Sequence, residues 1–243
     1  MIKIPVFCFA VVLGLMCSCT DSSTENQQIP PVRQYENEWM NVAFVVVDGV
    51  YNSELVAPMD IFHHTVFHTD PAMKVFTVAP DSSVITTFEG LRILPDYSFS
   101  SADLPDIDIL VVPSAENSMS SDLMDENLIG FVREKGQQAE YVISLCDGAF
   151  VLAKAGLVDG KRSTTFPTDI ETYKQRFPQL DVVSGVSFVH DENIITSAGG
   201  AKSYDPALYL CEFLYGHEVA LGLGKGLVID WDLNQVDHLV VSP

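Results

Sequence analysis

The sequence predicts an α/β domain with a mostly parallel sheet covered by helices on both faces, on three observations. Short, continuous apolar runs rich in Val and Ile recur along the chain, as expected for strands buried on both faces of a parallel sheet. Stretches with apolar residues at helical spacing follow most of these runs. This alternation of strand and helix is typical of parallel sheets, in which ligands bind at the carboxyl ends of the strands.

The expected strands are apolar runs that end at turn residues, and the expected helices lie between them. The strands cover residues 41–48, 74–79, 107–113 and 141–145, with a hairpin at 84–94 and a strand pair within 182–195. The helices cover residues 54–67, 122–135, 149–155, 170–176 and 204–215. We expect residues 40–243 to form one domain with a full hydrophobic core, and the mostly polar residues 19–39 to form a flexible tether.

Residues 1–18 have the features of an export signal. Lys3 precedes an apolar run that ends at Met16, and this run is too short to span a membrane. Cleavage after Ser18 would place Cys19 at the new N-terminus, which resembles a bacterial lipoprotein signal whose cysteine is lipidated. An ordinary secretory peptide cut nearby is the alternative. We therefore expect an exported lipoprotein, anchored to a membrane on its periplasmic side or at the cell surface.

The charge of the chain argues against one class of partner. The sequence has 33 acidic and 13 basic residues, with a formal net charge of −20. Such a charge repels phosphate backbones, which argues against a nucleic-acid partner. The charge can also serve only to keep an exported protein soluble, and it identifies no substrate.

Cys146 is the main chemical feature of the sequence. The segment SLCDG at residues 144–148 places this cysteine between a buried strand and a helix, with a glycine two residues later. The pattern is typical of a nucleophile elbow, a sharp turn that exposes the side chain beside a helix N-terminus that favours a thiolate. A buried cysteine at a strand end is the alternative. Cys211 lies in an apolar helical stretch, which favours a buried core position.

Two further segments are expected at the same edge of the sheet. Glu54 begins the helix after the first strand and can place a carboxyl group beside the sulfur, although an acid in the first turn of a helix is common. The loop at residues 113–116 follows the third core strand. It can direct a backbone N–H toward an oxyanion, together with the N–H of Asp147.

The histidines are not expected to form a site. His64 and His68 share a face of the first helix at i, i+4 spacing, but we expect a solvated or capping role for them. His190 precedes two acidic residues in a turn, so we expect it at the surface.

Five segments together resemble the ThiJ/PfpI superfamily, which has the flavodoxin-like, three-layer α/β fold of class I glutamine amidotransferase-like proteins. The resemblance implies that Cys146 is the nucleophile, that Glu54 is its acidic partner, and that the backbone amides of Ala115 and Asp147 form the oxyanion hole. The last two segments are most similar to the branch that holds isonitrile hydratases and the ligand-sensing domains of AraC-type regulators. The five segments are ELVAPMD at 54–60, VVPSA at 111–115, ISLCDGAF at 143–150, LAKAGLVDGKRSTT at 152–165 and TSAG at 196–199.

Two positions depart from the pattern of this superfamily. Many members have histidine where this chain has Phe166, so the usual candidate base is missing, and with it the support for protease, glyoxalase or deglycase chemistry. Isonitrile hydratases have threonine after the cysteine, where this chain has Asp147. A carboxylate that points toward the sulfur would work against thiolate formation.

Two functions follow from the residues and the resemblance. The first is an enzyme of the hydratase, lyase or hydrolase type, in which Cys146 attacks an electrophilic carbon of a small molecule and Glu54 exchanges protons with the adduct or with water. This chemistry requires no cofactor and no metal. The second is a non-catalytic domain of the same fold that binds or senses a small molecule. Because many members of the superfamily dimerise, a homodimer is a further expectation.

Overall fold

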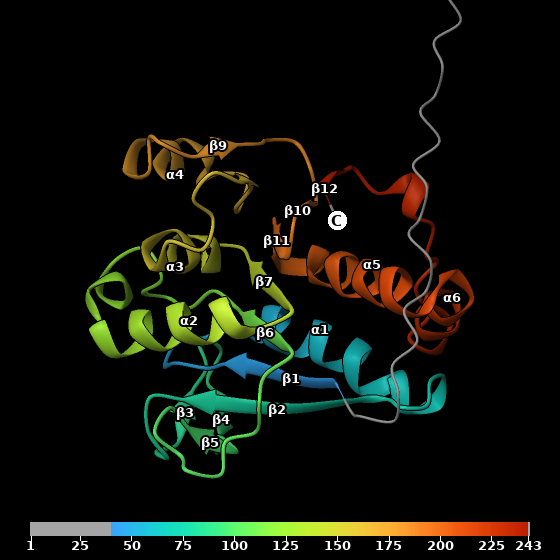
Figure 1. Cartoon of the computed structure of the whole chain (residues 1–243), viewed down its shortest axis with the longest axis horizontal. Coiled ribbons are helices and arrows are strands. Elements are labelled where there is room, and N and C mark those ends of the chain that lie inside the picture. The colour runs from blue at the N-terminus through green and yellow to red at the C-terminus, as the bar shows by residue number, and fades with distance from the viewer. Residues whose placement is uncertain (1–39, 243) are drawn as a thin grey trace, which may run out of the picture. The chain divides into compact units, whose positions relative to one another are not determined.

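A computed structural model of the chain describes residues 40–242 (Figure 1). The expected signal at residues 1–18, the lipidated Cys19 and the tether at 19–39 lie outside the described residues.

The described residues form a central eight-stranded sheet in the order β12-β10-β11-β7-β6-β1-β2-β5. All neighbouring strands are parallel except β10 and β11, which form an antiparallel pair. This arrangement confirms the predicted α/β fold with a mostly parallel sheet. The strands are β1 (Met40–Val45), β2 (Met73–Ala79), β5 (Tyr97–Ser98), β6 (Ile109–Val112), β7 (Tyr141–Leu145), β10 (Phe188–Asp191), β11 (Ile194–Ser197) and β12 (His238–Ser242).

Helices cover both faces of the sheet (Figure 1). On one face lie α1 (Asn52–His64), α5 (Tyr204–Tyr215) and α6 (His217–Gly226). On the other lie α2 (Glu126–Gln138) and α3 (Gly148–Ala155), with Tyr173 of the short helix α4 (Ile170–Arg176). Successive residues of a strand point to opposite faces, so β1 contributes Val42 and Phe44 to the first core and Ala43 and Val45 to the second.

Small elements complete the fold. A hairpin of β3 (Ile85–Thr86) and β4 (Arg92–Ile93) lies within the predicted hairpin, and the pair β8 (Arg162–Ser163) and β9 (Asp181–Val182) was not predicted. Short 3-10 helices are η1 (Thr65–Phe67), η2 (Ser121–Met124), η3 (Gly200–Ser203) and η4 (Leu233–Gln235).

The helix predicted over 122–135 begins later than expected. Asp125 is its N-cap, since the side chain of Asp125 accepts hydrogen bonds from the backbone N–H groups of Asn127 and Leu128 at 2.9 and 3.2 Å. These bonds satisfy amide groups that have no partner within the helix, so they define its first turn. The residues just before this cap form η2 instead of the same helix.

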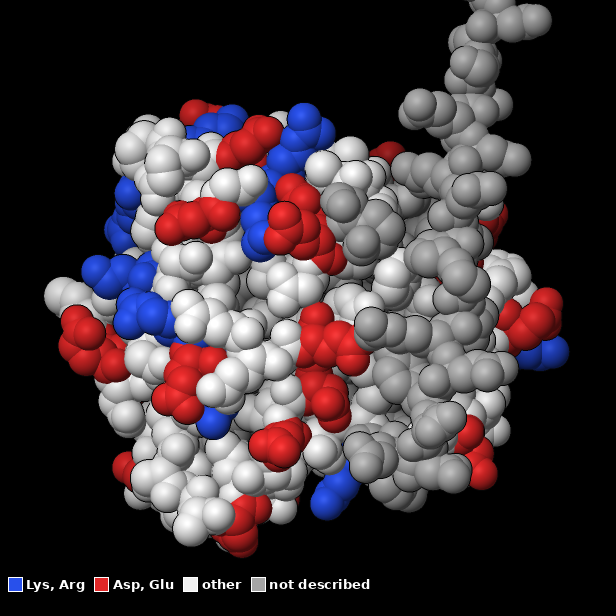
Figure 2. All heavy atoms as spheres, in the orientation of Figure 1, with Lys and Arg blue, Asp and Glu red and all other residues white. Residues whose placement is uncertain are grey.

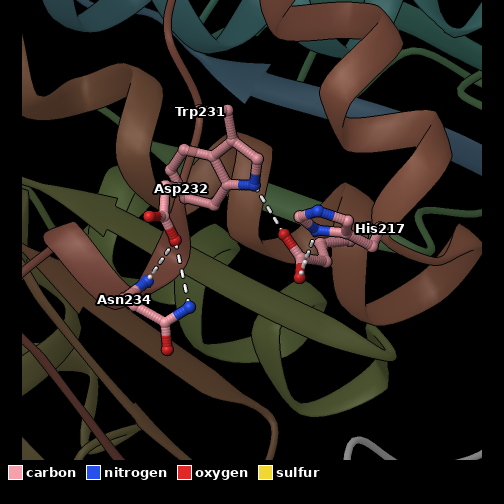
Figure 3. Close-up of polar contacts among 5 residues, drawn as sticks. His217, Trp231, Asp232 and Asn234 are labelled. Carbon is pink, nitrogen blue, oxygen red and sulfur yellow. Dashed lines mark hydrogen bonds and ion pairs between the residues drawn. The ribbon is translucent and has the colours of Figure 1, made fainter.

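A buried carboxylate fixes the C-terminal segment, which the sequence did not predict. Glu212 of α5 is 4% exposed and accepts a hydrogen bond from Trp231 Nε1 at 2.5 Å, while its other oxygen lies 3.1 Å from His217 Nδ1 (Figure 3). Asp232 then caps η4 by accepting hydrogen bonds from Asn234 (Figure 3). These contacts hold the chain that leads to β12 against α5 and α6.

The described surface is mixed in charge but rich in acids. On the face drawn in Figure 2, Asp and Glu side chains form several separate groups, whereas Lys and Arg side chains gather mainly toward one side. Within residues 40–242, no helix combines the length and the apolar character that crossing a membrane requires.

The close approach of α3 to β6 generates a prediction about stability. A Cβ atom at Gly148 would lie 2.1 Å from the carbonyl oxygen of Val112, which is backbone and cannot move aside. We expect Gly148→Ala to lower the free energy of unfolding by about 2 kcal/mol or more, because the overpacked helix must shift. The measurement is urea denaturation of the full chain, with unfolding monitored by circular dichroism.

Gly130 is the matched control, because a Cβ atom there would meet nothing within 4 Å and the residue lies in the interior of α2. Gly130→Ala should leave stability unchanged or raise it by up to about 1 kcal/mol, since alanine favours the helix. Equal unfolding free energies for the two variants would contradict the packing account.

Candidate active site

Cys146 lies at the sharp turn between β7 and α3, as predicted. Its φ angle is +53°, a left-handed conformation that is uncommon for residues other than glycine and that is found at functional turns. The turn is fixed by the hydrogen bond from Cys146 N to Ser197 O at 3.0 Å and by the approach of Gly199, where a Cβ atom would lie 2.4 Å from that of Cys146. The glycine is therefore required for the cysteine to occupy this position.

The expectation that the turn exposes Cys146 is wrong. The residue is only 6% exposed, because Gly199 and the surrounding loops close over it. Cys211 is 0% exposed in α5, which confirms its predicted core position.

Glu54 reaches the same place from α1. The side chain is 4% exposed; Oε2 accepts a hydrogen bond from Ser114 N at 3.0 Å, and Oε1 accepts one from Gly200 N at 3.3 Å. The Cys146 thiol is a third hydrogen-bonding partner of this carboxyl group. Burial raises the pKa of Glu54 to about 7, and these hydrogen bonds offset only part of that rise. The carboxyl group therefore gains and loses its proton near neutral pH.

The Cys146 thiol is held in its neutral form. Burial raises the pKa of the thiol well above its ordinary range, and the negative charges of Glu54 and Asp147 raise it further. The backbone N–H of Asp147, which hydrogen-bonds to the sulfur, acts in the opposite direction. Since burial and the two charges outweigh that amide, the helix N-terminus does not produce a stable thiolate here.

Asp147 points toward the sulfur, the orientation in which a carboxylate works against the thiolate. Its carboxyl group hydrogen-bonds to the thiol, and its Oδ1 lies 3.0 Å from the hydroxyl oxygen of Thr165. Burial raises the pKa of Asp147 to about 6, and the negative charge of Asp169 adds to the rise. Two carboxyl groups, from Glu54 and Asp147, thus contact one thiol.

The two expected oxyanion-hole amides differ in what they contact. The Asp147 N–H hydrogen-bonds to the sulfur itself. The Ala115 N–H donates to Ser118 Oγ at 2.8 Å, so the Ser118 hydroxyl would have to be displaced before this amide could bind an oxyanion. The oxyanion role of both amides stays a prediction.

Tyr51, which lies near the thiol, was not predicted. Burial raises the pKa of the Tyr51 phenol, and the electrostatic effect of the acidic groups of Cys146 and Glu54 adds to this rise, which places Tyr51 beside the site. Its ring lies 4.9 Å from that of Phe88 in the loop between β3 and β4. Tyr51 is three residues before Glu54, and this helical spacing was the only signal for it in the sequence.

Phe166, where the resemblance implies a histidine, supplies no base. Phe166 is 36% exposed, whereas its neighbour Thr165 is buried at 1%. A cavity of about 250 Å³ lies on this side of the site, and its wall includes Thr165, Ala198 and Lys202, with Asp237 from the C-terminal segment.

The predicted surface position of His190 is wrong. His190 is not at the surface: it is fully buried on β10, and its Nδ1 lies 2.8 Å from the Tyr209 hydroxyl. Burial lowers the pKa of His190 to about 4, so it is neutral at physiological pH. Across residues 40–242, no group of three or more His, Cys, Asp or Glu side chains is arranged to hold a metal ion.

Comparison with known proteins decides the family. The model of the DJ-1/PfpI family matches residues 40–212, which include Glu54, Cys146 and both loops beside them. The chain belongs to the DJ-1/PfpI family. This match confirms the ThiJ/PfpI assignment that the sequence resemblance implied.

DJ-1/PfpI relatives of this chain include enzymes and regulators. The chain is 30% identical to an isonitrile hydratase of Pseudomonas putida over 182 residues, 74% of this chain and 75% of the relative. It is 25% identical to the transcriptional regulator GbdR of Pseudomonas aeruginosa over 67% of this chain but only 43% of the regulator. The crystal structure of Drosophila melanogaster DJ-1beta superposes with a TM-score of 0.69 at 22% identity, covering 80% of this chain and all of that one.

The difference in burial between the two cysteines predicts which thiol reacts. Treatment of the folded full chain with iodoacetamide for increasing times should modify Cys146 before Cys211, because a small part of Cys146 but no part of Cys211 reaches solvent. Peptide mass mapping identifies the modified residue. Cys146→Ala should abolish modification of the described residues and Cys211→Ala should leave it unchanged, whereas equal modification of both thiols would contradict the structure.

Proposed function

We propose that the chain is a cysteine-dependent enzyme that adds water to an electrophilic carbon of a small molecule, with isonitriles as the first substrate class to test. The observation that carries the proposal is the contact of Cys146 with the buried Glu54 carboxyl group, whose pKa is about 7. A catalytic acid or base works best when its pKa lies near the operating pH. The isonitrile hydratase relative, which shares three quarters of its length with this chain, supports the choice of substrate.

The reaction proceeds in two steps without oxidation or reduction. In the first, Cys146 Sγ forms a bond to the substrate carbon, and the thiol proton passes to a carboxylate of the site. In an isonitrile, a π-electron pair of the carbon–nitrogen bond moves onto nitrogen, and the lone pair of the attacked carbon takes a proton from Glu54. In the second step, water adds to the same carbon and gives its proton to the Glu54 carboxylate, the carbon–sulfur bond breaks, and the sulfur regains its proton. The sum is substrate plus one water.

A second candidate function is a non-catalytic domain that binds or senses a small molecule. Its support is the absence of the superfamily histidine at Phe166 and the deep burial of Cys146. The match to a regulator such as GbdR, of which the chain spans 43%, is consistent with such a domain. Binding without turnover, measured by calorimetry with the same compounds, would favour this second function.

Turnover distinguishes the two functions. The full chain should convert at least one aliphatic isonitrile to the corresponding N-substituted formamide. Loss of the isonitrile band from the infrared spectrum measures the reaction. Cys146→Ala should abolish the conversion, and Glu54→Gln should lower kcat/KM by about 100-fold or more, since it removes a proton-transfer group. Cys211→Ala is the control that should retain activity. Equal rates for Cys146→Ala and the wild type would exclude the proposed mechanism.

The location of the protein is a separate proposal, based on the sequence of residues 1–39. We propose that Cys19 is lipidated after cleavage of residues 1–18 and that the acyl group anchors the exported domain. Metabolic labelling with a radioactive fatty acid in a bacterial host should mark the wild type and Cys17→Ala but not Cys19→Ala. Labelling that is lost in Cys17→Ala instead would show that the acylated cysteine was chosen wrongly. The homodimer implied by the resemblance stays a prediction, which sedimentation of the full chain would test.

A further inference from the structure

The proposed reaction requires a group that accepts the thiol proton, and the usual histidine is absent. Phe166 occupies the histidine position, and burial holds the Cys146 thiol in its neutral form. The carboxyl groups of Glu54 and Asp147 both hydrogen-bond to the sulfur, and each can accept a proton from it. Glu54 is already needed to give a proton to the substrate, so the acceptor is to be sought at Asp147.

The orientation of Asp147 is unusual for its position. Asp147 is the N-cap of α3, where an aspartate side chain ordinarily accepts a hydrogen bond from an amide of the first helical turn. Here the side chain makes no such capping bond. It turns instead toward the sulfur and toward Thr165. The helix α3 therefore lacks a side-chain capping bond from Asp147, whereas the Asp147 carboxyl group contacts the thiol.

Thr165 can stabilise Asp147 in both of its protonation states. Its hydroxyl oxygen lies 3.0 Å from Asp147 Oδ1 and 3.0 Å from the carbonyl oxygen of Cys146, but a hydroxyl has only one hydrogen to donate. When Asp147 is ionised, Thr165 donates to its carboxylate. When Asp147 carries a proton, Asp147 can donate to Thr165 Oγ1 while Thr165 donates to Cys146 O. The hydrogen bonds therefore reverse direction as the proton arrives, and no buried polar atom loses its partner.

The charged groups around Asp147 also suit proton exchange. Asp169, which precedes α4, raises the pKa of Asp147 beyond the effect of burial, to about 6. Glu54 on α1 and the Tyr51 phenol face the same charge, since Asp147 raises the pKa of both. Burial raises the pKa of both carboxyl groups on the sulfur toward neutral pH, where each can exchange a proton.

We propose that Asp147 is the general base of this site, which accepts the Cys146 proton in place of the missing histidine, and that Thr165 is its positioning residue. The inference rests on the proposed function, because Glu54 is set aside as the acceptor by its role as the acid of that reaction. As Sγ bonds to the electrophilic carbon, the S–H bond breaks and its proton moves to Asp147 Oδ. The proton returns to the sulfur when the carbon–sulfur bond breaks, so Asp147 ends each cycle ionised.

The sign of one substitution distinguishes a base from a mere charged neighbour. If Asp147 only repels the thiolate, Asp147→Asn lowers the pKa of the thiol and speeds its alkylation at neutral pH. If Asp147 accepts the thiol proton, Asp147→Asn slows alkylation by about tenfold or more. The experiment measures the rate at which iodoacetamide modifies Cys146 in the full chain as a function of pH, with folding checked by circular dichroism. Alkylation by iodoacetamide releases iodide and needs no proton from the protein, so the reaction does not require Glu54 as an acid.

Two further variants separate catalysis from structural damage. Asp169→Asn does not touch the sulfur, but it removes the charge that raises the pKa of Asp147, so the midpoint of the rate, about pH 6 in the wild type, should move to lower pH. Thr165→Val should slow alkylation and alter its pH profile, and Thr165→Ser should restore both.

Each outcome decides the inference. Slower alkylation of Asp147→Asn, together with a shifted pH midpoint of alkylation in Asp169→Asn, supports the inference. This holds even if no isonitrile is hydrated, because then only the proposed function fails. Unchanged or faster alkylation of Asp147→Asn overturns the inference, even if hydration is observed. A wild-type Cys146 that is not alkylated at any pH tested would overturn both.

Discussion

The buried carboxyl group of Glu54 is the constraint on which the site depends. It accepts one hydrogen bond from Ser114, in the loop after β6, and one from Gly200, in the loop after β11. Glu54 itself lies in α1, which follows β1, so one side chain joins three segments that follow strands at the same edge of the sheet. An unpaired carboxylate would be costly at 4% exposure, and these two backbone donors keep the group in place. Cys146 then meets a carboxyl group whose position is set by the backbone.

Burial and hydrogen bonding have opposite effects on the pKa of the Glu54 carboxyl group, and their balance sets its protonation near neutral pH. Two backbone donors alone would favour the ionised form and lower the pKa, but burial dominates and the pKa rises to about 7. The same burial raises the pKa of the thiol, and the contacting Asp147 carries its own raised pKa. Three acidic groups therefore share one small, poorly solvated space in which like charges disfavour each other. Proton transfer among them changes the charge less than full ionisation of the thiol would, which favours general base catalysis over a preformed thiolate.

The sequence predicted the elements whose patterns are local. The apolar run 141–145 followed by SLCDG predicted the turn at Cys146, and Gly148 and Gly199 now explain how α3 and the loop after β11 approach it so closely. The helix α6 was missed because Gly222 and Gly224 weaken helix propensity. In the structure these glycines allow contact with His68 and with the backbone of Ile229, so packing overrides propensity. The strand β12 pairs in parallel with β10, and a long connection separates the two strands in the sequence. No local pattern predicts this pairing.

The errors at the site have a common cause. The exposure of Cys146 and the buried position of His190 depend on which loops and helices close over them, and that is a tertiary property. The inward orientation of Asp147 depends on Thr165, which is 18 residues away in the sequence. Sequence patterns name such residues but do not give their contacts.

Burial should make the Glu54 carboxyl group titrate near neutral pH. Carbon-13 NMR of the full chain with labelled glutamate carboxyl groups measures this titration, with the Glu54 resonance assigned by its absence from Glu54→Gln. We expect a titration midpoint at about pH 7 for this resonance. A midpoint near 4.5, the ordinary value for glutamate, would show instead that water solvates the carboxyl group and that burial does not shift its pKa.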